Sequence, residues 1–461
     1  MQKHSRSHTQ TGNLSLGNYG FVFTVVLLCF ICASLSSSYV SLLVLLTIAC
    51  VTAVVVLNDN TLTSPVSMMA LFYYPYSTWR AYFNLFTDGA YSDVSLFGQL
   101  YYCLLGLLGL SGGALFIVVV SRRAKTSTKR KGKKNKRFRF KETNKAVKLI
   151  LIVMAPIVVF AGRGLSDSGA STKTEVYENL GLLGTLALTA FPWIAYSISY
   201  YAIVKGDRKI TLRRMLSDPY IMVTLALAIM GVLFFAKRDF LFRVLFGIAG
   251  AYAFHRRNIG WPLLAVGILA VSILVPIVGD LRGTVLASSN SEVRSLTWEI
   301  VFANEFHAPG RNLETLLYYG VEHDSSYLLN ELLRAVLSPF GDELMTSSQW
   351  FNEIYRPKMA FNDASGWGFT MVGTGYVAGG ALGVFAVMFF MSVVLQILYQ
   401  KRFKSTYWYC FYLAVIVSSI YCIRTDLSSF LSNIKIAAMV SGSFWIYEST
   451  LAREGRKLSR S

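Results

Sequence analysis

Four charged residues interrupt an apolar stretch near the middle of the chain. In FFAKRDFLFRVLFG, residues 234–247, Lys237, Arg238, Asp239 and Arg243 stand between two apolar runs. An arginine at mid-membrane costs about 2.5 to 3.5 kcal/mol on insertion scales, and less near the surface, where its head reaches water. Because a guanidinium pairs with phosphate oxygens in bidentate fashion, the stretch predicts a site for an anion at that depth, such as a lipid-linked phosphate. The alternative is structural: Arg238 contacts lipid headgroups, and Arg243 pairs with an acid on another helix.

Other residues that could take part in this chemistry lie in two later segments. Residues 422–435, CIRTDLSSFLSNIK, place Arg424, Asp426 and Lys435 between two apolar runs. They could be interfacial anchors, but an arginine and an aspartate beside further arginines also suit a polar cavity between helices. A long segment, residues 280–369, carries more candidates: Arg282, Arg294, Glu305, Arg311, His323 and Asp324.

The composition indicates that helices in a membrane hold these residues. Apolar residues make up 54% and aromatic residues 14% of the 461 positions, and the mean hydropathy is +0.47. A bilayer core about 30 Å thick takes roughly 20 helical residues. We therefore predict an all-α, polytopic membrane protein with about 12 transmembrane helices, of which the third and the eighth are the weakest. The apolar runs centre on residues 20–35, 38–57, 65–83, 96–120, 146–162, 178–204, 219–236, 240–254, 261–279, 370–398, 405–423 and 429–450.

The basic residues predict the orientation, because cytoplasmic loops carry the excess of lysine and arginine. Residues 122–141 hold 12 basic residues and no acid. The stretches KGDRKITLRR, HRRN, QKRFK and LAREGRKLSRS fall on the same side if both termini are cytoplasmic. The net charge of +19 is therefore mainly a topology signal. Since the basic run joins two spans and offers only two phenylalanines for stacking, we expect no nucleic-acid partner.

With this topology, residues 280–369 form one large external loop, longer than a connection needs. NLETLLYYG and SSYLLNELLRAVL have apolar residues at helical spacing, which predicts amphipathic helices that lie on the outer surface or dip into it. The glycines of GWGF and GTGYVAGGALG predict close helix packing on re-entry into the membrane. The chain then divides into N-terminal helices, a basic cytoplasmic loop, central helices, the external loop, and C-terminal helices with a cytoplasmic tail: residues 1–121, 122–145, 146–279, 280–369 and 370–461.

The cysteines do not indicate a metal centre. All six lie in apolar runs, as small core residues do, so neither a disulfide framework nor a metal site is predicted, and we expect no cofactor. They are Cys29, Cys32, Cys50, Cys103, Cys410 and Cys422.

Taken together, these pieces resemble the bacterial oligosaccharide repeat-unit polymerases, the O-antigen polymerase group, and more distantly the O-antigen ligases. The resemblance is carried by the arginine-containing turn AKRDF, an R-x-x-x-W segment from Arg294 to Trp298, HDSSYL, the glycine-rich re-entry and the final R-T-D. It covers most of residues 234–436. The chain departs from the ligases at Asp324, where they carry an asparagine, and in AKRDF, which lacks their small residues around the arginine.

The resemblance implies a GT-C-like architecture in the bacterial inner membrane and a metal-independent glycosyltransferase on its periplasmic face. One polyprenyl-diphosphate-linked glycan donates its chain to a sugar hydroxyl on another lipid-linked repeat unit, and polyprenyl diphosphate leaves. The implied partners are these lipid-linked oligosaccharides, the bilayer and a separate chain-length regulator.

Departure of a diphosphate concentrates negative charge, which fixed cations can stabilise. Carried over from the ligase-like pattern, Arg238 and Arg294 are the expected clamp, with Arg282, Arg243 and Arg424 behind them.

The attacking hydroxyl also needs a base, for which His323 is the candidate, with Asp324, Glu305, Glu314 or Glu322 as its partner. The alternative is an ordinary hydrogen-bonded surface histidine.

Further substrate contacts are expected from Asp426 and from Arg311, which could instead cap loop structure. Aromatic side chains could stack on sugar rings, although at least half are expected to anchor the loop at the interface. These are Trp298, Tyr318, Tyr319, Tyr327, Trp350 and Trp367.

Two other functions stay open. An O-antigen ligase would use the same donor with a lipid A core acceptor. A flippase for lipid-linked sugars, or another transporter, also suits twelve spans with both ends inside. Against a transporter stand the lack of recognisable repeated halves and the concentration of arginines around one external loop.

Overall fold

A computed structural model of the chain describes residues 15–58, 64–86, 92–127, 143–167, 181–205, 211–235, 238–256, 298–337, 344–355 and 369–458. Within these ranges all regular structure is helical and no strand occurs. Six of the helices described there are long and apolar enough to cross a membrane, so the chain is a multi-pass membrane protein. The six segments are Leu16–Ser34, Tyr39–Val56, Asp93–Arg123, Ala146–Leu165, Gly181–Lys205 and Met371–Lys401.

The helices follow the predicted apolar runs closely. They are α1 (Leu16–Ser34), α2 (Tyr39–Val56), α3 (Pro65–Phe86), α4 (Asp93–Ser127), α5 (Thr143–Asp167), α7 (Gly181–Lys205), α8 (Leu212–Leu216), α9 (Pro219–Phe235), α10 (Arg238–Arg256), α12 (Trp298–Tyr318), α13 (Ser326–Leu337), α14 (Ser347–Tyr355), α15 (Met371–Lys401), α16 (Thr406–Cys422) and α17 (Leu427–Leu458).

Eleven of the twelve predicted runs coincide with a helix, and the run at 261–279 lies outside the described residues. Helices α9 and α16 are apolar but shorter than a full span. Helices α3, α10 and α17 carry more polar residues, so their passage through the membrane, and the total of twelve, stay predictions.

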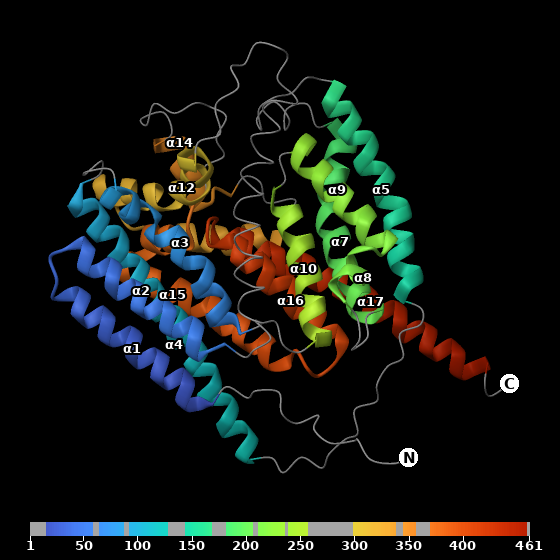
Figure 1. Ribbon diagram of the computed structural model, residues 1–461, viewed down its shortest axis with the longest axis horizontal. Helices are drawn as coiled ribbons and strands as arrows, with labels where there is room; N and C mark the ends of the chain where they lie inside the picture. The colour runs from blue at the N-terminus through green and yellow to red at the C-terminus, as the bar shows by residue number, and fades with distance from the viewer. Residues whose placement is uncertain are drawn as a thin grey trace.

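The helices form two groups joined by the C-terminal ones (Figure 1). Helices α1 to α4 pack together, and α15 packs along α4. Helices α5, α7, α9 and α10 form the second group, against which α16 and α17 lie. In Figure 1 the first group is blue, the second green, and α15 to α17 run between them in orange to red. Helix α10 comes from the middle of the chain and α16 and α17 from its C-terminal part, so segments far apart in the sequence meet where these three helices pack together.

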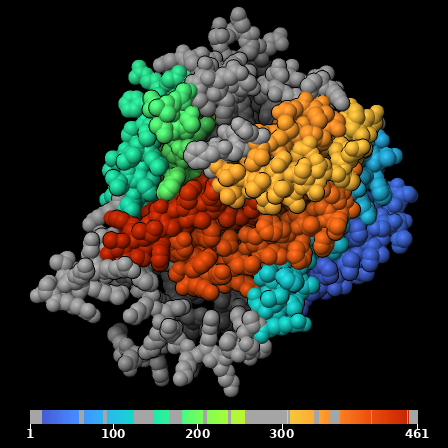
Figure 2. Space-filling model, turned by 180° about the vertical axis from the view of Figure 1, so that it is seen from behind, coloured from blue at the N-terminus to red at the C-terminus, as the bar shows by residue number. Residues whose placement is uncertain are grey.

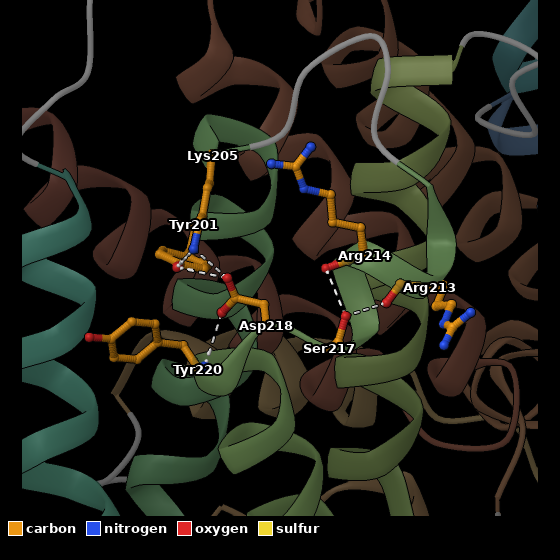
Figure 3. A network of polar contacts seen from close by, with 7 residues as sticks. All are labelled: Tyr201, Lys205, Arg213, Arg214, Ser217, Asp218 and Tyr220. Carbon is orange, nitrogen blue, oxygen red and sulfur yellow. Dashed lines mark hydrogen bonds and ion pairs between the residues drawn. The ribbon is translucent and has the colours of Figure 1, made fainter.

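A polar cluster joins α7 to α9 at the end predicted to be cytoplasmic (Figure 3). The Lys205 ammonium donates to the Asp218 carboxylate and, at 2.7 Å, to the Tyr201 hydroxyl. Asp218 also accepts the backbone N–H of Tyr220 at 3.0 Å, as a residue before a helix commonly does. Lys205 and Asp218 thus fasten the end of α7 to the start of α9.

Helices α12, α13 and α14 cover the opposite end, where the predicted external loop lies. The two predicted amphipathic segments are helical: they form the second half of α12 and all of α13. Helix α12 packs on α3 and α4, and α13 packs on α17 and α15. Figure 2 shows the yellow to orange loop helices spread over the upper margin of the orange-red C-terminal helices.

The glycine-rich re-entry bends α15 sharply. Gly380 has φ of +57°, which favours glycine, and a Cβ there would lie 2.8 Å from Nε2 of His323. On either side of the bend, Gly375 and Gly383 touch backbone to backbone, since a Cβ on Gly383 would lie 2.1 Å from the carbonyl oxygen of Gly375. Close backbone packing is therefore found at Gly375 and Gly383, and the glycines of GWGF lie outside the described residues.

Candidate functional site: a polar cleft at the predicted outer end

A polar cleft of about 420 Å³ opens where α10, α16 and α17 meet the connection between α13 and α14. All four pieces lie at the end of the bundle that the charge pattern predicts to face outward. The cleft is lined almost wholly by polar residues: Asp239, Arg243, Arg334, Thr346, Ser348, Gln349, Tyr421, Thr425, Asp426, Ser428, Ser429, Ser432 and Asn433.

Arg243 forms the buried wall of the cleft. Its side chain is 6% exposed, and its Nη2 lies 3.2 Å from an Asp239 carboxylate oxygen. Nη1 donates to the Tyr196 hydroxyl at 2.8 Å, to Asn433 Oδ1 at 2.9 Å and to Ser418 Oγ at 3.1 Å. Four contacts from α7, α10, α16 and α17 thus fix the guanidinium.

The acid that pairs with Arg243 was expected on another helix but belongs to α10 itself, one turn earlier. Asp239 can reach because residues four apart face the same side of a helix. One donor of Arg243 remains: its buried Nε has no hydrogen-bond partner among the described residues. An unsatisfied buried donor is costly, and a bound anion or water would satisfy it.

Asp426 stands at the start of α17 and keeps one carboxylate oxygen free. Its Oδ1 accepts the backbone N–H of Ser429 at 2.9 Å and the Ser429 hydroxyl at 2.6 Å, which caps the helix. Its Oδ2 accepts no hydrogen bond from the part of the chain that the structure describes. Asp426 is therefore held in place and can still accept a proton or a hydrogen bond.

Behind the cleft, Glu331 joins three elements of the structure. It is fully buried on α13 and accepts hydrogen bonds from the hydroxyl and the backbone N–H of Ser347, the latter at 3.2 Å, and from the Ser428 N–H at 2.7 Å. Ser347 begins α14 and Ser428 is the second residue of α17, so one carboxylate caps two helices. Burial, followed by the charge of Asp426, raises the pKa of Glu331 to about 8.

Arg334 closes the loop side of the cleft. Its Nη1 donates to the Leu344 carbonyl at 2.8 Å and to the Gln349 side chain, whose Oε1 also accepts the Thr346 N–H. These bonds hold the start of α14 against α13. The loop side of the cleft is thus built from hydrogen bonds rather than from apolar packing.

The structure places His323 at the other end of α13 from Arg334. Its ring is exposed and packs edge-on against Tyr376 of α15, with ring centroids 4.9 Å apart. His323 is brought there because α12 ends at Tyr318 and Gly320, with a φ of +58°, turns the chain. Ser326 and Arg334 are eight residues apart, or about 12 Å along the helix. The two candidate regions are therefore separate.

The acids proposed to assist His323 are engaged elsewhere or point to solvent. Asp324 accepts the Ser326 N–H at 2.8 Å and its hydroxyl at 2.7 Å, and these bonds lower the pKa of the Asp324 carboxyl. Glu314 pairs with buried Arg80 and so ties α12 to α3. Glu322 is exposed.

The remaining predicted residues have different positions. Arg238 is the first residue of α10, next to the lining residue Asp239, and its side chain lies outside the described part of the structure, as does that of Glu305 on α12. Arg424 sits in the turn before α17, 5.7 Å from the centre of the Tyr421 ring. Arg311 lies on α12. Arg282 and Arg294 lie outside the described residues.

The sequence analysis singled out Arg243 and Asp426 but missed Arg334 and Glu331. Both missed residues belong to a segment that was noted only for its apolar periodicity. Their spacing could have indicated them, because Glu331 and Arg334 stand three residues apart among leucines, which places both on one side of α13.

Comparison with known proteins adds nothing to the geometry. No protein-family model matches the chain, and no curated protein or solved structure shows significant similarity to it.

Proposed function

We propose that the protein is a glycosyltransferase that polymerises polyprenyl-diphosphate-linked oligosaccharide repeat units at the outer face of the bacterial inner membrane. The observation that carries the proposal is Arg243: a buried, fixed arginine on the wall of a polar cleft, with one donor left over. The resemblance of the glycine-rich re-entry and R-T-D to the polymerases, and of AKRDF and HDSSYL to the related ligases, supports the same assignment.

In this proposal the cleft holds the diphosphate of the donor. Arg243 and Arg334 supply positive charge at its walls, and Arg238 and Arg424 stand beside it in the chain. Fixed cations stabilise a leaving diphosphate most effectively where water is excluded. Because Asp239 and Asp426 balance the two lining arginines, the neighbouring arginines are needed to make the site attractive to an anion.

Asp426 is then the carboxylate in position to act as the base. Its Oδ2 takes the proton of the acceptor hydroxyl, and the hydroxyl oxygen forms a bond to the anomeric carbon of the donor. The bond from that carbon to the phosphate oxygen breaks, and the diphosphate leaves with the electron pair. The assignment of His323 as the base stays a prediction, and in this proposal Asp426 takes that role.

Reconstitution tests the proposal. The purified protein would be placed in liposomes with lipid-linked oligosaccharides extracted from cells that lack it, and the products separated by size. We expect chains of several repeats with the wild-type protein, loss of about 100-fold in rate with Asp426→Asn, and normal chains with Glu353→Gln, a change at an exposed carboxylate of α14. If the wild-type protein joins no repeats, or only moves the lipid between leaflets, the proposal is wrong.

A further inference from the structure

Helix α13 carries its apolar residues on its exposed side. Five side chains are exposed, from 38% for Leu332 to 74% for Val336. They recur at intervals of three and four residues, so they form one continuous stripe along the helix. The stripe consists of Leu329, Leu332, Leu333, Val336 and Leu337.

The opposite face of α13 is the charged one. Glu331 is fully buried and caps α14 and α17, and Arg334 lines the polar cleft. A helix on a water-exposed surface has the reverse arrangement, with its leucines inside and its charges in solvent. The exposed side of α13 is therefore unlike that of a helix whose outer face is in water.

The neighbouring helices continue this apolar surface. Helix α13 packs on α15 and α17, which expose Leu382, Met439, Trp445 and Ile446. The end of α13 is fastened to α17, because the Lys435 ammonium donates to the Ala335 carbonyl at 2.8 Å. Figure 2 shows the loop helices lying directly against the C-terminal helices on this face.

We propose that α13 lies within the outer leaflet of the bilayer, with the leucine stripe against lipid acyl chains, and forms the wall between the lipid and the polar cleft. The occupant of the stripe is thus the acyl region of the membrane, which the same chain already contacts through its spanning helices. Helix α13 is then an embedded wall and not an extramembrane lid.

The position of α13 also determines how the substrate reaches the cleft, a step that rests on the proposed function. A polyprenyl chain remains in the bilayer while its diphosphate enters the cleft. Because α13 separates these two regions, the substrate must pass beside α13. The charged face of this helix would meet the diphosphate, and its apolar face would meet the isoprenoid chain.

Fluorescence quenching in liposomes tests the position of α13. Leu333→Cys and Val336→Cys, and Glu353→Cys as a matched control on α14, would be made in a Cys32→Ser background, since Cys32 is the exposed cysteine among the six. Each would carry an environment-sensitive fluorophore. At positions 333 and 336 we expect blue-shifted emission that a doxyl-labelled lipid quenches more strongly than iodide does, and at 353 the reverse order. Stronger quenching by iodide at 333 and 336 would show a water-exposed or protein-covered face and overturn the proposal.

Polymer synthesis separates this inference from the proposed function. The double variant Leu333→Asp/Val336→Asp leaves the cleft residues in place but makes the stripe unfavourable for acyl chains. With the fluorophore placed at Leu337→Cys, another exposed residue of the stripe, we expect it to lose lipid quenching and polymer product together. Lipid quenching without any polymer from the wild-type protein would refute the proposed function alone, while iodide quenching in an active wild-type protein would refute the position of α13 alone.

Discussion

At the scale of single residues, the central feature is an arginine held by four partners at once. Arg243 has a carboxylate, two hydroxyls and an amide oxygen as partners, and its Nε faces none of them. Structural pairing alone would be complete with Asp239. The guanidinium is thus fixed by four helices, and its buried Nε has no hydrogen-bond partner among the described residues, as is also true of the Nε atoms of Arg80 and Arg402.

Replacing Arg243 with lysine should therefore remove most of the activity. Lysine keeps the charge but loses the planar fork that holds four partners and, in the proposed function, a phosphate. We expect a loss of about 100-fold in polymerisation rate, comparable to removing one oxyanion donor elsewhere. Arg213→Lys, at the opposite end of the protein, is the matched control. A lysine variant as active as the wild type, at equal abundance in the membrane, would remove Arg243 from the site.

Glu331 predicts how stability changes with pH. Its pKa is about 8 in the folded protein against 4.5 in the unfolded chain, so between these values the folded state holds a proton that the unfolded state has lost. Stability from this group is present below pH 4.5 and is lost as the pH rises to 8. The full shift corresponds to roughly 5 kcal/mol.

Thermal unfolding of the wild type and of Glu331→Gln between pH 5 and 8 measures this effect. The wild-type midpoint should fall over that range, and the midpoint of the variant should fall less, because an amide does not titrate. Glu353→Gln should follow the wild type. Parallel curves for wild type and Glu331→Gln would show that Glu331 keeps an ordinary pKa.

At the scale of elements, close backbone contact joins the two longest described apolar helices. A Cβ on Gly113 of α4 would lie 2.4 Å from the Phe389 carbonyl oxygen of α15, and one on Gly109 would lie 2.6 Å from that of Phe385. Small residues four apart are what allow helices in a membrane to approach this closely.

Gly113→Ala should therefore force α4 and α15 apart. Overpacking of this kind costs about 1 to 3 kcal/mol, which should appear as a lower thermal midpoint in detergent. Gly20→Ala on α1, where nothing lies within 4 Å of the new Cβ, provides the control. Equal midpoints for the two variants would contradict the packing.

The sequence predicts these elements better than their meeting points. The apolar runs predicted the positions of the spanning helices because each helix needs about 20 apolar residues of its own to cross the bilayer core. The site depends on contacts between segments 100 to 200 residues apart, such as Arg243 with Asn433 or Glu331 with Ser428, which no local pattern records. The sequence showed a glycine-rich stretch around Gly380 but did not predict that α15 bends there.

At the scale of the whole molecule, the polar cleft and the basic stretches lie at opposite ends. The cleft joins the starts of α10 and α17 to α13 and α14, whereas Lys205 and Asp218 lie toward the other end, where α7 ends and α9 begins. The positive-inside pattern then predicts that the cleft lies outside the cytoplasm. The proposed chemistry requires this orientation.

Labelling of cysteines from one side tests the orientation. In a Cys32→Ser background, a membrane-impermeant maleimide should label Ser326→Cys, at the start of α13, in intact spheroplasts. It should label Lys404→Cys, between α15 and α16, only after the membrane is opened. Labelling in the opposite order would place the cleft in the cytoplasm and exclude an outer-face transferase.

The central claim, polymerisation of lipid-linked repeats, is tested most directly by the surface polysaccharide ladder of cells that lack the protein. We predict that such cells carry caps of a single repeat, that the wild-type gene restores the full ladder, and that Asp426→Asn and Arg243→Lys at matched membrane abundance do not. A null strain with no surface glycan would instead indicate a ligase or a flippase. A normal ladder in the null strain would contradict the account altogether.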